Sequence, residues 1–336
     1  MTITAIIPAY NEFEELPRAV ASLRAQSLPP DQIIIALNNA KPGLFGAAVA
    51  TGASVIDLGR CPNLKAEALN RLIAEILPQM HDDDLLLVAD ADGTLASTWI
   101  ETAAGLMGPA VVVGGVFLGQ SGGGWLGKAQ RNEYLSYARE VVARRDKAWV
   151  LTGTGTMFRA DQARAVLERR DRLYDEQVST EDFELTVTFR ELGFRCLSPK
   201  GCEVTTEVMS SLRSLHDQRV RWYRGAVETL RLHGISRVTA PYLWQQAKIL
   251  TGFLLSWVAM ALTLILALAG QLTWSWWWVI ALIPVASRVV GGQHKWFAAT
   301  VLPELVYDLL LQRSLAAGWW RALTSKGRVW NAAEGM

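Results

Sequence analysis

The feature that most restricts how this chain can fold is a run of 39 residues, from Ile249 to Ser287, that contains no Asp, Glu, Lys, Arg or His. A helix that crosses a bilayer needs about 20 mostly apolar residues. The run therefore predicts two transmembrane helices, over residues 249–270 and 274–290, with a short polar break between them. Two buried helices in a large soluble core are the alternative, which the length of the uncharged run disfavours.

Positive charges flank the run on both sides and predict its orientation. Several arginines and Lys248 precede it, and Arg288 and Lys295 follow it. Because cytoplasmic flanks carry an excess of Lys and Arg, we expect both ends of the run to face the cytoplasm. The chain also starts without the basic and apolar pattern of a signal peptide, so we expect its N-terminal part to remain cytoplasmic.

The tail after the run has a different pattern. Residues 296–320 carry apolar side chains at helical spacing, interrupted by Pro303, Glu304, Asp308 and Arg313. This pattern favours a helix that lies in the cytoplasmic membrane interface over a third crossing. We therefore expect a cytoplasmic domain over residues 1–240, two transmembrane helices within 241–295, and an interfacial helix and tail over 296–336.

Charge and cysteine content exclude some classes of function. The chain has 33 Lys and Arg against 32 Asp and Glu, a net charge of +1, so we expect no nucleic-acid partner. The three cysteines, Cys61, Cys196 and Cys202, are too few and too scattered for a disulfide framework or a zinc site. We interpret them as reduced core residues.

Residues 1 to about 205 alternate short apolar runs with longer helical patterns, which is typical of an α/β domain. Buried parallel strands are expected over residues 4–8 and 32–37, with a crossover helix over 14–26 between them. Two further strands are expected over 85–89 and 110–117.

Polar residues follow these strands at the edge where open parallel sheets bind ligands. Glu12 follows the first strand, Asn38 and Asn39 the second, and Asp90 and Asp92 the third. Two carboxylates one residue apart can share a hard divalent cation that also binds diphosphate oxygens. An ordinary polar turn is the alternative interpretation of this pair.

Two further constellations also have a structural and a functional interpretation. In Ser179–Asp182, Ser179 or Thr180 could cap a helix, and carboxylates in a first helical turn are stabilised by the helix dipole with or without a role in chemistry. Residues 218–222, QRVRW, suit phosphate and sugar contacts, but they also suit a basic helix next to a membrane.

Taken in order, IPAYNE, DAD, GTGTMFR, TED and QRVRW before an apolar segment resemble the membrane-integrated family 2 glycosyltransferases, which include the cellulose, chitin, hyaluronan and poly-N-acetylglucosamine synthases. The resemblance covers about residues 3–330. It implies a nucleotide-sugar-binding domain of the GT-A type, an α/β fold with helices on both faces of the sheet. It also implies inverting sugar transfer assisted by Mg²⁺ or Mn²⁺.

The resemblance assigns roles to single residues. Asp182 would be the general base, and Asp90 and Asp92 would hold the metal. Arg221 and Lys65 would lie beside the donor diphosphate. The nucleotide sugar would be bordered by Pro8, Ala9, Tyr10, Glu12, Asn38 and Asp90. The acceptor would be bound by Thr154, Gly155, Glu181, Gln218 and Trp222.

One departure concerns the donor. Many relatives carry an aspartate after the second strand that contacts the uracil ring, and this chain carries Asn38 and Asn39 there. An amide offers a hydrogen-bond donor as well as an acceptor, so the base stays open, with a UDP-sugar preferred.

The resulting hypothesis is a multi-pass membrane transferase that adds a sugar, on the cytoplasmic side, to a growing glycan or a membrane-held acceptor. Single-sugar transfer to a lipid, such as a polyprenyl phosphate or a glycolipid, is the alternative. An inactive membrane scaffold of the same fold is a third possibility. The expected partners are a nucleotide-sugar donor, a glycan or lipid-linked acceptor, membrane lipid, and further copies of the chain or a partner membrane subunit.

Overall fold

The computed structural model describes residues 1–271 and 301–324. The second predicted transmembrane helix, over 274–290, lies outside these residues. By its internal contacts the chain divides into two compact units. The first unit comprises Met1–His233 and the described residues from Ser314 onward, and the second unit comprises the described residues of Gly234–Arg313.

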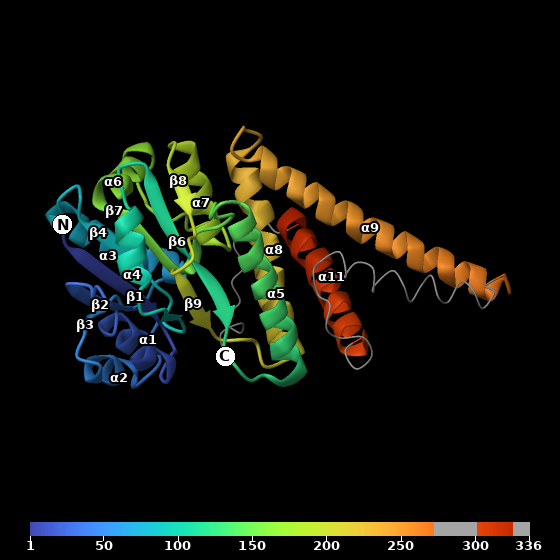
Figure 1. Ribbon diagram of the computed structural model, residues 1–336, viewed down its shortest axis with the longest axis horizontal. Coiled ribbons are helices and arrows are strands. Elements are labelled where there is room, and N and C mark those ends of the chain that lie inside the picture. Colours follow the sequence, from blue (N-terminus) through green and yellow to red (C-terminus); the bar gives the residue numbers. More distant parts are fainter. Residues whose placement is uncertain (272–300, 325–336) are drawn as a thin grey trace. The chain divides into compact units, whose positions relative to one another are not determined.

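The first unit is built on a mixed sheet (Figure 1). Its strands are β1 (Ile3–Ala9), β2 (Gln32–Leu37), β3 (Ser54–Asp57), β4 (Leu85–Val88), β5 (Thr94–Leu95), β6 (Val111–Gly119), β7 (Thr152–Arg159), β8 (Arg195–Leu197) and β9 (Glu203–Thr206). Within the described ranges they follow the order β3-β2-β1-β4-β7-β6-β9-β5, and β8 pairs with β6. Strands β1 to β4 pair in parallel, whereas β7 is antiparallel to both of its neighbours, β4 and β6.

Helices cover both faces of this sheet. The helices of the first unit are α1 (Glu15–Arg24), α2 (Leu44–Ala50), α3 (Leu64–Ile76), α4 (Trp99–Leu106), α5 (Gly124–Ala143), α6 (Ala160–Arg169), α7 (Glu181–Glu191) and α8 (Leu212–His233), and a short 3₁₀ helix, η1 (Leu77–Gln79), follows α3. Successive side chains of a strand point to opposite faces. Accordingly, Ile6 of β1 packs in a core with α3, α6 and α7, and Ala5 and Ile7 pack in a second core with α1, α2 and α4.

The α/β class is confirmed, with one correction to the sheet. Strands predicted over 4–8, 32–37, 85–89 and 110–117 are β1, β2, β4 and β6, with ends that differ by at most two residues. The helix predicted over 14–26 is α1. The sheet is mixed rather than parallel, because residues 152–159 form the antiparallel strand β7, which the sequence does not signal by an apolar run. The three cysteines are free and buried, as predicted.

The chain leaves the first unit at the end of α8 and rejoins it at Ser314, within α11 (Val301–Thr324). Within the first unit, Gly318 of α11 lies against α8 so closely that an added Cβ would stand 2.9 Å from the Val220 carbonyl oxygen. The Arg231 Nη1 atom donates to the Ala322 carbonyl oxygen at 2.8 Å, and His216 Nδ1 lies 2.8 Å from Ser314 Oγ. The C-terminal half of the segment predicted to be an interfacial helix is therefore packed on α8.

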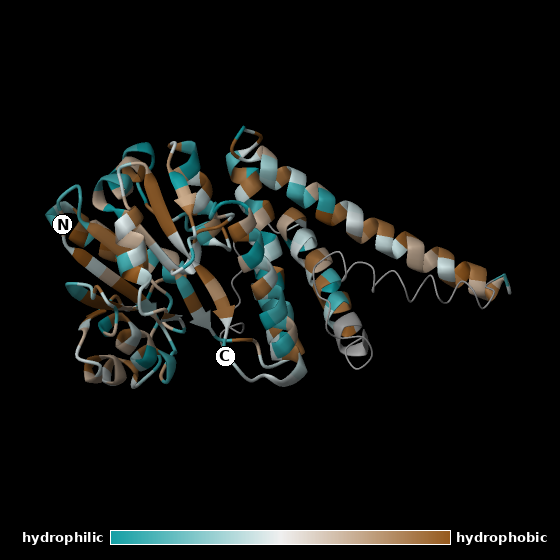
Figure 2. Ribbon diagram, in the orientation of Figure 1, coloured by the Kyte–Doolittle hydropathy of each residue, from teal (hydrophilic) through white to brown (hydrophobic). Residues whose placement is uncertain are grey.

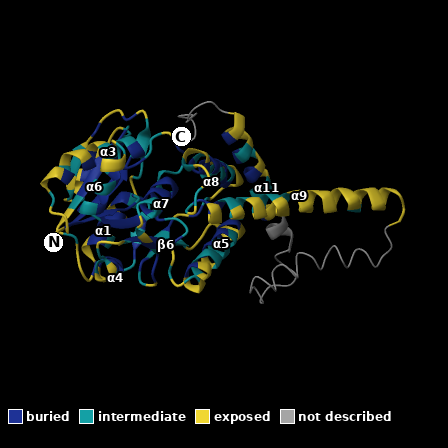
Figure 3. Ribbon diagram, turned by 90° about the horizontal axis from the view of Figure 1, so that it is seen from above, coloured by how far each residue is buried: buried dark blue, intermediate teal, exposed yellow. Residues whose placement is uncertain are grey.

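The second unit contains α9 (Ala240–Leu268), a helix of 29 residues. At 1.5 Å per residue it extends about 43 Å, more than the roughly 30 Å of a bilayer's hydrocarbon core. It is the one helix of the described residues that is long and apolar enough to cross a membrane, and no residue of its apolar window is buried. Figure 2 shows hydrophobic residues along most of α9, and Figure 3 shows that it is exposed. The predicted span over 249–270 thus coincides with a helix that has the required length and composition.

A buried carboxylate anchors α7 to its neighbours. Glu184 is fully buried, and it accepts hydrogen bonds from Arg170 Nη1 at 2.5 Å and Nη2 at 2.9 Å, and from Thr188 Oγ1 at 2.8 Å. His233 Nε2 lies 2.9 Å from the same carboxylate. Burial favours the neutral acid, but the hydrogen bonds from His233 and Arg170 outweigh it and lower the pKa of Glu184 to about 2. The carboxylate therefore ties α7 to the loop after α6 and to the end of α8.

Replacing Glu184 by alanine should strongly destabilise the first unit, because Arg170, whose side chain is only 19% exposed, would lose the fully buried carboxylate that pairs with it. Breaking a buried ion pair from one side costs about 3–5 kcal/mol. Urea or thermal unfolding of the purified chain measures the loss, with Glu168→Ala, an exposed position on α6, as the control that should change the free energy of unfolding by at most about 0.5 kcal/mol. Equal stability of the two variants would contradict this account.

Candidate active site

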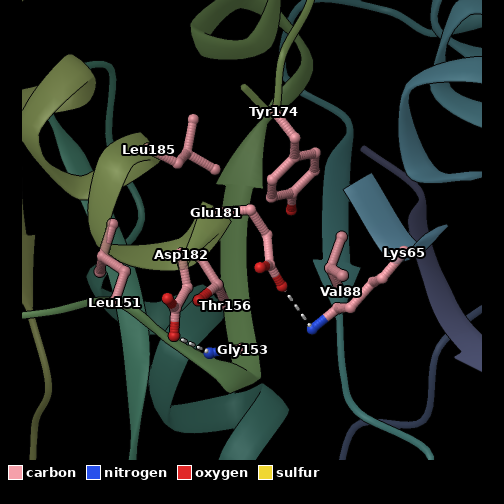
Figure 4. A pocket seen from close by; sticks show the side chains of 9 residues that line it. All are labelled: Lys65, Val88, Leu151, Gly153, Thr156, Tyr174, Glu181, Asp182 and Leu185. Atoms are coloured by element: carbon pink, nitrogen blue, oxygen red, sulfur yellow. Dashed lines mark hydrogen bonds and ion pairs between the residues drawn. The ribbon is translucent and has the colours of Figure 1, made fainter. Parts of the chain in front are cut away.

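The predicted acidic residues meet at one edge of the sheet, where Lys65 pairs with both Asp90 and Glu181. Figure 4 shows Glu181 and Asp182 there, with Lys65 and Gly153. Asp90 and Asp92 follow β4, Lys65 lies in the first turn of α3, and Glu181 and Asp182 open α7. A pocket at this edge is lined by Lys65, Val88, Leu151, Gly153, Thr156, Tyr174, Glu181, Asp182 and Leu185. Residues from four distant parts of the sequence thus converge on a single small pocket.

Lys65 bridges two of the carboxylates. Its Nζ atom donates to Asp90 Oδ1 and lies 3.2 Å from Glu181 Oε1. Burial lowers the pKa of Lys65, but the charges of Asp90 and Glu181 outweigh this effect and hold the pKa above its usual value. For Glu181, burial raises the pKa, but the charges of Lys65 and Arg221 contribute to a net lowering. Both Lys65 and Glu181 are therefore charged at neutral pH.

Asp182 is oriented by two backbone amides. The amide of Gly153 donates to Oδ2 at 3.1 Å, and the amide of Phe183 donates to Oδ1 at 2.7 Å. Burial and the neighbouring charge of Glu181 nevertheless raise the pKa of Asp182 to about 6. A carboxylate with a pKa closer to neutrality is a stronger base than an exposed aspartate, so this residue is suited to accept a proton from a substrate.

Asp92 has the environment of a cation ligand. Burial and the charge of Asp90 raise its pKa to about 7, and its Oδ2 atom accepts a hydrogen bond of 3.3 Å from Thr206. Two crowded carboxylates suit a hard divalent cation, which relieves their repulsion and takes its remaining ligands from substrate phosphates. Among the residues that the structure describes, no cluster of three or more His, Cys, Asp or Glu forms a cage of protein ligands. The pair Asp90 and Asp92 therefore fits a cation that is bound together with a phosphate-bearing substrate.

The first two strand ends have a structural role that the sequence does not reveal. Glu12 Oε2 accepts hydrogen bonds from the amides of Tyr10 and Asn11, both at 2.8 Å, and so shapes the loop after β1. Asn39 uses its side-chain amide to pair with the backbone of Cys61, at 2.8 and 3.1 Å. Asn38 is buried, and Pro8 and Ala9 are buried at the end of β1. 

The QRVRW residues separate into two groups on α8. Arg219 is buried, stacks on Trp222 at 4.0 Å from the ring centroid, and donates to Glu133 Oε2 at 2.8 Å. It also donates to Gln218 Oε1 at 3.0 Å. Arg221, in contrast, is exposed, and its charge helps to lower the pKa of Glu181. Arg219 thus fixes the Trp222 ring, whereas Arg221 is accessible to a ligand on the side of the acidic residues.

The glycines of β7 differ in what they face. Gly153 lies at the pocket, where an added Cβ would stand 2.8 Å from Lys65 Nζ and 3.2 Å from Asp90 Oδ2. Gly155 is buried, and an added Cβ there would meet the Trp99 ring at 3.3 Å. Thr154 Oγ1 lies 2.8 Å from Thr152 Oγ1. Sequence reasoning thus missed Gly153 as a site residue, although it begins the GTGTMFR motif.

Tyr174 is a second pocket residue that the sequence does not single out. Its ring is buried, and its backbone is held by the Asn70 side chain through hydrogen bonds of 2.8 Å in both directions. Burial raises the pKa of Tyr174 above its usual value. It precedes the TED residues in an irregular segment without a periodic pattern, so no sequence signal identifies it.

Comparison with known proteins identifies this arrangement. A family model described as "Glycosyltransferase like family 2" matches residues 2–225, which include both acidic motifs and QRVRW. The chain belongs to this glycosyltransferase family. A search of curated proteins finds no match.

The chain is also similar to solved structures of glycosyltransferases. The mannosyltransferase PcManGT from Pyrobaculum calidifontis, in complex with GDP-Man and Mn²⁺, is 18% identical with a TM-score of 0.67, and the alignment covers 97% of this chain and 88% of that one. Glucosyl-3-phosphoglycerate synthase from Mycobacterium tuberculosis is 18% identical with a TM-score of 0.43, over 70% of this chain and 79% of that one. The first likeness shows a shared GT-A-like fold.

Gly153→Ala should impair the glycosyltransferase without unfolding it. The added methyl group displaces the Lys65 ammonium from Asp90, and a misplacement of about 1 Å at an active site can lower the rate about 100-fold. We expect a loss of activity of about 10- to 100-fold, measured by release of nucleotide from the donor. Gly46→Ala on α2, where nothing lies within 4 Å of an added Cβ, is the matched control. Similar activity of the two variants would mean that Gly153 does not shape the site.

Proposed function

We propose that this glycosyltransferase moves a sugar from a nucleotide-sugar donor to an acceptor hydroxyl, with inversion at the anomeric carbon and with Asp182 as the general base. The observation that carries the proposal is the position of Asp182 at the start of α7, held by the Gly153 amide and given a pKa of about 6. An acceptor hydroxyl is a poor nucleophile until a base takes its proton. Attack opposite the leaving diphosphate then inverts the configuration in one displacement.

Asp90 and Asp92 are the proposed holders of Mg²⁺ or Mn²⁺ on the donor side. When bound, the cation offsets the negative charge that develops on the leaving diphosphate. Lys65 and Arg221 add positive charge at the same edge, and their contribution is largest where water is excluded. Pro8, Ala9, Tyr10, Glu12 and Asn38 are the proposed border of the nucleotide. A UDP-sugar is the proposed donor, and a GDP-sugar is the first competitor, because the mannosyltransferase of similar fold was solved with GDP-Man.

The proposed acceptor is a growing glycan or a lipid-linked molecule at the cytoplasmic face of a membrane. The exposed apolar length of α9 supports an acceptor that is held in the membrane, and therefore supports single-sugar transfer to a lipid as a specific alternative to chain extension. Trp222 would stack on the acceptor. The other proposed acceptor contacts are Thr154, Gly155, Glu181 and Gln218. The motif pattern supports a place among the membrane-integrated family 2 enzymes.

The test is transfer by the detergent-purified chain with Mn²⁺, using UDP-, GDP- and dTDP-sugars and membrane lipid extract as the acceptor source. We expect Asp182→Asn to lower transfer by about 100-fold or more, because removal of a general base costs that much, while donor binding persists. Asp171→Asn, an exposed aspartate with 83% side-chain exposure, is the control and should retain full activity. A product ladder indicates chain extension, and a single added mass indicates lipid glycosylation.

If Asp182→Asn retains the wild-type rate, Asp182 is not the base. If none of the donors is used or bound by the folded chain, the proposed reaction is wrong.

The pH dependence of the turnover number is a separate prediction. Asp182 must be ionised to accept a proton, so kcat should fall as the pH drops below about 6. Because the folded-state pKa is raised above the ordinary value of an aspartate, protonation of this group adds to the free energy of unfolding as the pH falls from 7 to 5. Activity should therefore decline between pH 7 and pH 5. Protonation of Asp182 should not destabilise the fold over the same range, and circular dichroism at each pH checks that the chain stays folded. A flat rate between pH 5 and 7 would contradict the assignment.

A further inference from the structure

Helix α8 touches the backbone immediately before the acidic pair of α7. Gly225, in the middle of α8, lies against Thr180, so that a Cβ added to Gly225 would stand 2.2 Å from Thr180 Oγ1 and 2.6 Å from Thr180 Cγ2. A glycine inside a helix costs about 1 kcal/mol relative to alanine. This contact supplies a physical reason for glycine at this position, since any side chain would force the two segments apart.

Thr180 itself has an unusual environment. It is the residue before the first turn of α7, yet its side chain makes no capping hydrogen bond, although the sequence allows a cap at Ser179 or Thr180. Within the described parts of the chain, its Oγ1 atom is among the buried side-chain atoms without a hydrogen-bond partner. A buried hydroxyl without a partner is unfavourable and calls for an explanation. Close packing of Thr180 against α8 provides one.

A second contact lies one helical turn further along α8. The amide of Ser179 donates to Glu228 Oε2 at 2.9 Å, and the other carboxylate oxygen, Oε1, accepts from Arg224 Nε at 2.5 Å. The Arg224 and Glu228 side chains are 8% and 16% exposed, so the pair is largely shielded from water. Hydrogen bonds to charged groups contribute about 1.5–3 kcal/mol each. The backbone at Ser179 and Thr180 is therefore held to α8 by one steric and one charged contact.

The same helix carries Arg221 and Trp222, one turn before Gly225. The Trp222 ring is stacked on the buried Arg219 of the same helix. A shift of α8 relative to Thr180 would change the distance between Arg221 and Glu181, which interact electrostatically. One helix therefore both contacts the turn before the acidic pair and carries the arginine that interacts with Glu181.

We propose that Gly225 and Glu228 are positioning residues for the acidic pair Glu181 and Asp182. They hold the turn before α7 at a fixed distance from α8, and so place Asp182 relative to Arg221 and Trp222. This inference rests on the proposed function for the role of Asp182, but the positioning itself is a property of the fold. Neither residue contacts the reacting atoms.

The experiment compares three variants in the full chain. Gly225→Ala adds a methyl group against Thr180, Glu228→Ala removes the acceptor of the Ser179 amide without adding volume, and Gly105→Ala is the control, because nothing lies within 4 Å of an added Cβ at that helical glycine. We expect kcat to fall about 10- to 100-fold in the first two and to be unchanged in the control. Donor affinity, measured by calorimetry with the nucleotide sugar and Mn²⁺, should change less than kcat, because Asp90 and Asp92 are untouched.

Two rescue variants separate positioning from general packing. Glu228→Gln keeps a carbonyl oxygen that accepts the Ser179 amide, so it should retain most of the rate. Thr180→Gly removes the Thr180 side-chain atoms that the methyl group of Gly225→Ala would meet. The double variant Thr180→Gly with Gly225→Ala should therefore have a higher kcat than Gly225→Ala alone. A purely structural role would change the melting temperature without this pattern of rescue in kcat.

Hydrogen exchange supplies a readout that needs no activity. Peptides spanning residues 176–184 should exchange faster in Gly225→Ala and Glu228→Ala than in the wild type and in Gly105→Ala. If exchange and kcat are both unchanged in these two variants, the inference is wrong. If exchange accelerates but Asp182→Asn is as active as the wild type, the positioning stands and the proposed role of Asp182 is wrong. If Gly225→Ala does not fold, Glu228→Ala and Glu228→Gln decide the question by the same measurements.

Discussion

The rest of the site depends on one ammonium group among several carboxylates. Lys65 lies between Asp90 and Glu181, and its charge also lowers the pKa of Asp92 and Asp182 from where burial would leave them. Without that charge, burial would favour the neutral acids at this edge. The lysine therefore lets partly buried carboxylates converge, while leaving two of them with pKa values near neutrality. Lys65 of α3 therefore both stabilises the buried carboxylates by its charge and leaves Asp92 and Asp182 able to take up a proton near neutral pH.

This balance requires that the carboxylates stay where Lys65 can reach them, and α7 supplies that constraint. The helix is anchored in its first turn by Glu184 with Arg170 and His233, and just before its start by Ser179 and Thr180 against α8. Both anchors are largely buried, so neither is weakened much by salt or water. A flexible α7 would allow Asp182 to leave the Gly153 amide and ionise in solvent. The ion pairs of Glu184 and Glu228 therefore stabilise the same helix, α7, that carries the proposed base, Asp182.

The sequence predicts the strand ends and the acidic pairs well, because apolar runs and adjacent carboxylates are local patterns. Asp90, Asp92, Glu181 and Asp182 do lie at one edge of the sheet, as the topology of open α/β sheets suggests. Sequence reasoning does not find three features of the site: the antiparallel strand β7, the position of Gly153 at the pocket, and the buried ring of Tyr174. Each depends on pairing or packing between segments far apart in the chain, and none has a period that a single segment could reveal. Arg219 is a similar case, since only the structure separates its buried role from the exposure of Arg221.

The packing of α11 on α8 has a topological consequence. The chain leaves the first unit at His233 and rejoins it at Ser314, where Gly318 fits against Val220 and Tyr223. The two ends of the intervening segment therefore belong to the same folded body. Because a folded body lies on one side of a membrane, a segment that leaves it and returns to it can cross a bilayer only an even number of times. The helix pair thus constrains the parity of any crossings and not their existence.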